Sequence, residues 1–186
     1  QTGINVGVNA APTLINNLLS GAATGSATGM ATGIFVDGTS TANTVVGTSV
    51  FHGVGNPGTP GTSPITVAGT AAMFVSSATR NFYLTQGSSA IDSSLNGLPD
   101  RPTMTTVLSP LGIPVSPIIA PDQDLYGQLR KDDPSQASFP GIGANIVKDR
   151  GAIERADFTQ PTLLFKDLVT TEPDANFQLR FDRLTG

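Results

Sequence analysis

The sequence predicts an all-β protein, built as a parallel β-helix (a solenoid) with a C-terminal cap and a short trailing β segment. Short runs of β-branched residues are separated by clusters of Gly, Asn, Ser, Thr and Pro, which favour turns. Charged residues make up 13% of the chain, about half the usual share, while Gly contributes 21 residues and Pro 14. Such a chain must fold through many turns and many small apolar contacts rather than through ion pairs.

Residues 1–84 are predicted to form the coils of the solenoid. No stretch there has a sustained 3.6-residue apolar period, and the β-branched runs have the length of strands. The expected strands are Ile4–Val8, Thr13–Leu19, Gly33–Val36, Thr44–Phe51, Ile65–Ala68, Met73–Val75 and Asn81–Leu84. The side chains expected to point inward are Leu14, Ile15, Ile34, Val36, Val45, Val50, Ile65, Val67 and Phe74. The segment from Val54 to Ser63 is interpreted as a projecting loop.

The distribution of charge favours a solenoid over a β-sandwich. Between Gln1 and Thr79 the only charged residue is Asp37, whereas a sandwich normally carries more charge on its solvent faces. Coils of about 20–30 residues would stack on one another to bury their inner faces. Three asparagines beside the strands suit coil corners, either as hydrogen-bonded ladders or as ordinary turn residues: Asn16, Asn17 and Asn43.

The second half of the chain carries an ordered set of motifs: Asn81-Phe82-Tyr83-Leu84 with Gln86–Asp92, then Asp122–Arg130, then Asp149–Glu154. This order resembles the C-terminal end of bacterial right-handed parallel β-helix repeat proteins. The ending of choice-of-anchor Q domain proteins, and of giant surface proteins from planctomycete-like bacteria, is particularly similar. Ser89 stands where the family pattern has Pro, Arg150 stands where it has Ile, and a long insert separates the first two motifs.

The resemblance implies a right-handed coil and a C-terminal capping region over residues 85–160. Terminal repeats of a solenoid need a polar outer face, and the motifs supply charged residues for one. The expected capping residues are Asp92, Arg130, Asp149 and Glu154, assisted by Arg101, Asp124 and Arg150. We expect Arg130, Asp149 and Glu154 to lie close together at the end of the solenoid, above Ile91 and Ile153 as buried plugs.

Little in the sequence indicates catalysis. Sugar-cleaving β-helices use clustered acids, and the coils offer Asp37 alone. The single histidine, His52, lacks a nucleophile motif nearby and is interpreted as structural. Asp122 and Asp124 with Gly127 are a weak calcium candidate; the alternative is a turn whose carboxylates cap backbone amides. We therefore expect no enzyme activity and no cofactor, with calcium as a weak possibility.

Composition restricts the partners and the location. A net charge of −4 without a Lys/Arg cluster argues against nucleic acid. The chain lacks a run of about 18 apolar residues, so membrane insertion is not expected. It contains no cysteine and begins at Gln1 without a signal-peptide pattern, as a processed chain or a fragment would. The resemblance itself implies an extracellular or cell-surface protein.

Residues 161–186 are predicted to be a linker and strands of a following domain or an assembly contact. Phe177, Leu179 and Phe181 alternate with polar residues, as in a half-buried strand. Two strands cannot form a domain alone, so they would begin another domain, pack back on the helix, or complete an identical subunit. The predicted function is a structural or adhesive module of a bacterial surface protein; the alternative is a β-helix that binds or processes carbohydrate, with surface glycans as partners.

Overall fold

The computed structural model describes residues 1–21, 30–136 and 147–155, and most of its regular structure is short β-strand. The helical elements are α1 (Pro102–Leu108) and the 3-10 turns η2 (Thr41–Asn43), η3 (Ser77–Thr79) and η4 (Ser109–Leu111). The strands are β1 (Thr2–Val6), β2 (Thr13–Ile15), β3 (Leu18–Ser20), β4 (Met30–Val36), β5 (Val45–Gly47), β6 (Val50–His52), β7 (Val54–Gly58), β8 (Ile65–Val67), β9 (Phe74–Ser76), β10 (Asn81–Leu84), β11 (Gly97–Leu98) and β12 (Ile118–Ile119).

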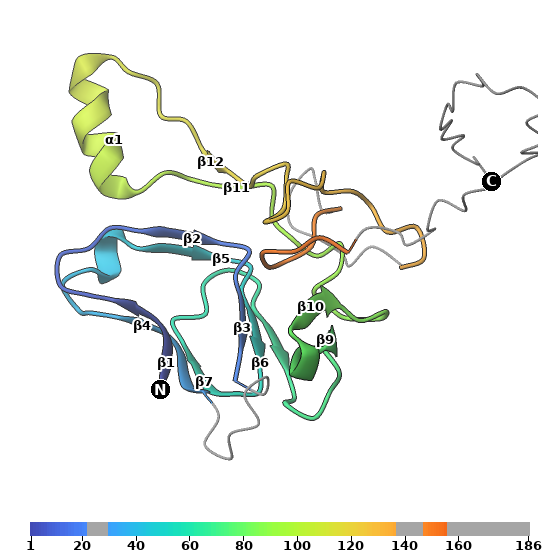
Figure 1. Cartoon of the computed structure of the whole chain (residues 1–186). Coiled ribbons are helices and arrows are strands. Elements are labelled where there is room, and N and C mark those ends of the chain that lie inside the picture. Colours follow the sequence, from blue (N-terminus) through green and yellow to red (C-terminus); the bar gives the residue numbers. More distant parts are fainter. Residues whose placement is uncertain (22–29, 137–146, 156–186) are drawn as a thin grey trace, which may run out of the picture. The chain divides into compact units, whose positions relative to one another are not determined.

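The first eight strands form stacked parallel sheets. Strands β1, β2 and β3 pair in parallel with β4, β5 and β6, in the same order. Strand β4 then pairs with β7 and β6 with β8, again in parallel, which gives the sheets β1-β4-β7, β2-β5 and β3-β6-β8. A parallel bridge between Gly47 and Thr62 continues the middle sheet. The chain thus visits the three sheets in turn, once per level (residues 1–21, 30–52 and 54–67; Figure 1).

This pairing confirms the predicted parallel strands as far as Val67 and corrects one part of the prediction. The segment interpreted as a projecting loop begins with strand β7. Val54–Gly58 contains Gly and Pro and lacks the run of β-branched residues that indicates a strand. It forms a strand because it pairs in parallel with β4.

The corner between the second and third strand of each level has the same backbone conformation. Asn16, Thr48 and Ser63 occupy this corner in successive levels, with φ of 54°, 50° and 45°. Asparagine tolerates this left-handed region better than most residues. The Asn16 Oδ1 atom accepts a hydrogen bond of 2.6 Å from the Thr48 hydroxyl. Corner side chains of adjacent levels are therefore bonded, although asparagine bonds to threonine here rather than to another asparagine.

An apolar core lies between the three sheets. Its buried members are Leu19, Ile34, Val46, Phe51 and Val54, with Ile4, Leu14 and Val36 packed against them. The Phe51 ring fills the space beside Gly33, where a Cβ atom would lie 2.5 Å from a ring carbon. A side chain at position 33 and a large ring at position 51 therefore exclude each other.

A second apolar cluster covers the outer face of the β3-β6-β8 sheet. It comprises Val50, Met73, Leu84, Ala90 and Ile91, with Leu18, Ile65, Val67 and Phe74 packed against them. Neighbouring residues of a strand face opposite sides, so Val50 points to this cluster while Phe51 points to the core. The prediction that Val50, Ile65, Val67 and Phe74 belong to the inner core is therefore wrong. This sheet is buried on both faces.

The parallel pattern ends before residue 84. Strands β9 and β10 form an antiparallel pair, with Asn81 opposite Ser76 and Leu84 opposite Phe74. The reversal occurs at η3 and at Arg80, whose φ of 61° turns the chain back. The expectation of parallel strands throughout residues 1–84 is therefore wrong for the last two strands. The turn at Arg80 brings β10 back beside β9, its neighbour in the chain, so the two strands pair antiparallel with each other.

The long insert between the first two motifs contains α1, which the sequence did not indicate. Pro102 begins the helix, where its missing N–H costs no hydrogen bond. The base of the insert is closed by the antiparallel pair β11-β12. Within the described residues, no helix is long and apolar enough to span a membrane.

Candidate functional site

Motif residues of the second half meet two of their neighbours in a group of ionisable side chains, which we call the polar cluster: Asp92, Asp133, Asp149, Glu154, Arg130 and Arg155. The four acids are each at most 1% exposed. Arg130 Nη1 donates hydrogen bonds to Glu154 Oε2 at 2.9 Å and to the Asp149 carbonyl at 3.0 Å. The structure thus brings together Arg130, Asp149 and Glu154, as expected, and adds Asp133 and Arg155, which carry a 3.4 Å ion pair.

The carboxylates of the polar cluster mainly bind backbone N–H groups. Asp149 accepts from the N–H of Asp92 at 3.0 Å and of Arg155 at 2.6 Å. Glu154 accepts from the N–H of Lys131 at 2.9 Å and of Asp149 at 3.0 Å. Asp92 in turn accepts from the Asp133 N–H at 3.2 Å. Side chains therefore satisfy backbone groups that no strand ladder pairs.

Burial changes the acidity of these groups. It raises the pKa of Asp92 to about 7, and the neighbouring charges of Asp132, Asp133 and Glu154 act in the same direction. Burial likewise raises the pKa of Asp149 to about 8, with repulsion from Glu154 contributing. Burial also raises the pKa of Glu154, although its hydrogen bonds and Arg130 oppose the shift. The folded protein therefore binds the protons of Asp92 and Asp149 more tightly than an unfolded chain does.

The polar cluster belongs to a region that lies along the flank of the stacked levels. We call residues 73–98, 120–136 and 147–155 the covering region. Gly151 N donates to the Asn16 carbonyl at 2.8 Å, in the first level. Arg150 Nη1 bonds to the carbonyls of Ser49 at 3.5 Å and Ser63 at 2.9 Å, in the second and third levels. The region therefore reaches all three levels from the side.

This position corrects two expectations for the cap. The sequence predicts Asp92, Arg130, Asp149 and Glu154 on a polar outer face at the end of the solenoid, whereas Asp92, Asp149 and Glu154 are buried, and the Arg130 side chain is only 7% exposed. The physical reason is that the outer face of the β3-β6-β8 sheet is apolar and needs a cover. The plugs Ile91 and Ile153 are buried as expected, while Ala152 is exposed.

Arg150 is a buried cation held by carbonyl oxygens. Its Nε atom donates to the Ser93 carbonyl at 2.7 Å, so one guanidinium joins the covering region to the corners of the second and third levels. Burial lowers the pKa of Arg150 to about 10, but the group remains charged at neutral pH. Arg150 is therefore a central contact between the covering region and the levels.

The calcium candidates are engaged by the protein itself. Asp124 accepts from the backbone N–H groups of Tyr126, Gln128 and Glu154, which is the turn-capping alternative. Asp122 binds the buried Lys148 ammonium at 2.6 Å, which lowers the pKa of Asp122. Within the described ranges, no three His, Cys, Asp or Glu side chains are grouped so that they could hold a metal ion.

His52 is buried and bonded on both ring nitrogens. Nε2 lies 2.9 Å from the Ala71 carbonyl and Nδ1 lies 2.8 Å from the Ser20 hydroxyl. Because a carbonyl can only accept, Nε2 carries a proton and donates it to the Ala71 carbonyl, while Nδ1 and the Ser20 hydroxyl form the second hydrogen bond. These contacts join adjacent levels at Ser20 and His52, which are register partners.

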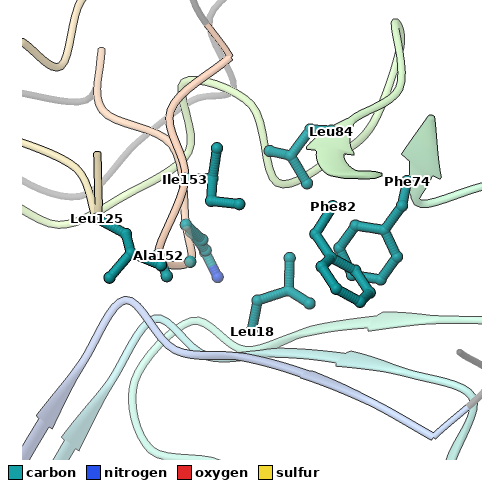
Figure 2. Close-up of a pocket in the computed structure, with 9 residues that line it drawn as sticks. Leu18, Phe74, Phe82, Leu84, Leu125, Ala152 and Ile153 are labelled. Atoms are coloured by element: carbon teal, nitrogen blue, oxygen red, sulfur yellow. The ribbon is translucent and has the colours of Figure 1, made fainter. Parts of the chain in front are cut away.

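An apolar pocket opens between the covering region and the first level. Its volume is about 240 Å³, and its lining residues are Leu18, Phe74, Phe82, Leu84, Leu125, Arg150, Gly151, Ala152 and Ile153. Figure 2 shows Phe74, Phe82 and Leu84 on one side, Leu125, Ala152 and Ile153 on the other, and Leu18 below them. Phe74 and Phe82 meet edge to face, with ring centroids 5.5 Å apart. The site is suited to a hydrocarbon group.

Some features of this region were not predictable from the sequence. The roles of Lys148 and Arg150 were missed because charged residues are mostly exposed, and the pocket depends on residues far apart in the chain. The one indication of their roles was that Lys148 and Arg150 flank Asp149 in the sequence and lie close to Glu154. The expected assembly residues Phe177, Leu179 and Phe181 lie outside the described residues.

Comparisons of the chain with family models, with curated proteins and with solved structures found no match.

Proposed function

We propose that the chain is a structural module of an extracellular or cell-surface protein, in which a right-handed parallel β-helix serves as a scaffold. The observation that carries the proposal is the use of the acids as internal braces. Asp92, Asp149 and Glu154 are buried and bonded to backbone N–H groups. Carboxylates engaged in this way brace the fold and are not presented to a substrate.

The stacked levels support the same proposal. Repeated parallel pairing gives a rigid body whose surface carries almost no charge, since Asp37 is the only charged residue before Arg80. Such a body suits a spacer or display element better than a site for ionic substrates. The resemblance of the motifs between Asn81 and Glu154 to the ends of bacterial β-helix proteins supports placing the module outside the cell.

The location is tested with antibodies raised against the chain and applied to intact source cells. Labelling of unpermeabilised cells, lost after brief protease treatment of the surface, is the expected result. Labelling that appears only after permeabilisation would contradict the proposal.

The scaffold role is tested by separating it from carbohydrate recognition. We expect the purified chain to show no binding on an array of bacterial and host glycans, and no release of reducing ends from polysaccharides. Saturable binding to one glycan class, abolished by substitution of the exposed Tyr126, would overturn the scaffold role in favour of the carbohydrate alternative.

A further inference from the structure

The two tyrosines of the chain stack on each other, although they lie far apart in the sequence. Tyr83 belongs to β10, and Tyr126 belongs to the turn between Asp124 and Gly127. Their ring centroids are 6.1 Å apart and their ring planes are inclined by 25°, as in an offset stack. Because the sequence contains only two tyrosines, every phenol of the chain takes part in this contact.

Hydrogen bonds position both rings. The Tyr83 hydroxyl accepts a hydrogen bond of 3.1 Å from the side-chain amide of Gln128. The Tyr126 N–H donates to the Asp124 carboxylate at 2.8 Å, and the Gln128 N–H donates to the same carboxylate at 2.9 Å. One carboxylate therefore shapes the turn, and Gln128 connects that turn to β10. The turn that carries Tyr126 is thus held next to Tyr83.

The composition of the chain directs one-electron oxidation to this pair. Tyrosine, tryptophan and cysteine are the side chains that most readily lose an electron and a proton, and the chain contains neither tryptophan nor cysteine. Tyr126 is 60% exposed, so a soluble oxidant can reach its ring. Tyr83 is half-buried beside it. A phenoxyl radical formed on one ring therefore lies against the other phenol of the chain.

We propose that Tyr83 and Tyr126 form an oxidative crosslinking site that braces the covering region, in which a haem peroxidase and hydrogen peroxide join the two rings as a dityrosine. Each phenol loses one electron and one proton. The two phenoxyl radicals then pair, and a carbon–carbon bond forms between the ring carbons adjacent to the two C–O carbons. The hydrogen atoms on the joined carbons move to the oxygens, which restores both aromatic rings. The two electrons and two protons reduce one hydrogen peroxide to two water molecules.

The crosslink joins two separate segments of the covering region. It connects β10 covalently to residues 120–136 and closes the loop that contains α1. Such a bond restricts the unfolded chain as a disulfide does, and this chain has no cysteine from which to form a disulfide. The proposal goes beyond the scaffold function and does not depend on it, because the reaction is a property of the isolated chain.

Treatment of the dilute purified chain with a haem peroxidase and limiting hydrogen peroxide tests the reaction. The expected product is monomeric on a denaturing gel, shows dityrosine fluorescence and has an intact mass lower by two hydrogen atoms. Cyanogen bromide cleaves after methionine and separates the two tyrosines at Met104, so residues 74–104 and 105–186 should stay joined in the product. Absence of this product, or dityrosine found only between separate chains, would overturn the proposal.

Three variants separate the crosslink from the stack itself. Tyr83→Phe and Tyr126→Phe each keep an aromatic ring in the contact but remove one phenol, so both should fold and neither should form the internal product. The matched control, Tyr126→Phe with Phe35→Tyr, keeps two tyrosines, because Phe35 is 49% exposed on β4 in a different sheet. It should yield less internal dityrosine than the wild type by about tenfold or more. Equal yields would mean that the stack does not direct the reaction, which contradicts the proposal.

Thermal unfolding gives an independent measure of the brace. The crosslinked chain should melt several degrees above the untreated chain, because the new bond lowers the entropy of the unfolded state. Tyr126→Phe, treated in the same way, should show no rise. A crosslinked chain that melts at the temperature of the untreated chain would overturn the bracing role, whereas surface labelling of cells decides the scaffold function separately.

Discussion

The stacked levels and the covering region hold their backbones in different ways. In the levels, parallel ladders pair strand with strand, and the side chains contribute an apolar core around Ile34 and Phe51. In the covering region, regular pairing is sparse, and buried carboxyl and guanidinium side chains bind the backbone groups instead, as those of Asp149, Glu154 and Arg150 do.

This difference in backbone pairing explains why most charged residues of the chain lie outside the levels. A repeated strand satisfies its own backbone through its neighbours, so the levels need almost no charge. An irregular segment that must lie against an apolar sheet has no such neighbours, and an ionised side chain is a strong acceptor or donor for the groups left over. The same charges make the covering region sensitive to substitution and to pH.

The largest effect is expected from removing the cation that joins the two regions. Arg150→Met leaves the buried Ser93 carbonyl without its donor and removes the hydrogen bond to the Ser63 carbonyl, and should lower the free energy of unfolding by about 3 kcal/mol. Chemical denaturation measures this. The control is Arg80→Met, because Arg80 is exposed; an equal effect of both substitutions would mean that Arg150 does not join the regions.

A smaller loss of stability is expected from a substitution in the core of the levels, away from the covering region. Gly33→Ala places a Cβ atom 2.5 Å from the Phe51 ring and should cost about 1–3 kcal/mol, read from the midpoint of urea unfolding. Gly7→Ala is the control, since nothing lies within 4 Å of its Cβ. Phe51→Leu should reduce the penalty of Gly33→Ala in a double-mutant cycle; strictly additive effects would contradict the packing described.

The third prediction concerns pH. Because the folded protein raises the pKa of Asp92 to about 7 and of Asp149 to about 8, it holds these protons more tightly than the unfolded chain. Their contribution to stability is therefore greatest below pH of about 4 and is lost as pH rises through 7 to 8, by an amount on the order of 1–3 kcal/mol. The melting temperature followed from pH 5 to pH 8.5 measures it.

Asp92→Asn sharpens that measurement. Its amide oxygen can still accept the Asp133 N–H, and asparagine suits the φ of 47° at this position. The variant should match or exceed the wild type at pH 8.5 and show a shallower decline with pH. A decline as steep as that of the wild type would mean that Asp92 does not carry the effect.

The levels and the covering region also differ in how far their structure could be predicted from the sequence. Most strands of the levels were predictable, since β-branched runs bounded by turn residues indicate them, whereas β7 and the antiparallel pairing of β9 with β10 were not. Which side chains of a strand point into the core was not predictable. Val50 and Phe51 are both apolar, so the alternation of side chains cannot decide which of them points to the core. The motif order predicted that Arg130, Asp149 and Glu154 meet, yet not that they are buried, because charge ordinarily indicates a surface.

The most direct test of the stacked parallel levels is a register-specific disulfide. Asn5 and Phe35 are partners on the exposed face of β1 and β4, and adjacent strands lie about 4.8 Å apart, within reach of a disulfide. We predict that Asn5→Cys with Phe35→Cys forms an intramolecular disulfide under mild oxidation, whereas Asn5→Cys with Val75→Cys does not, as measured by intact mass after alkylation of free thiols. Absence of the first disulfide, or equal formation of both, would contradict the parallel stacking on which this account rests.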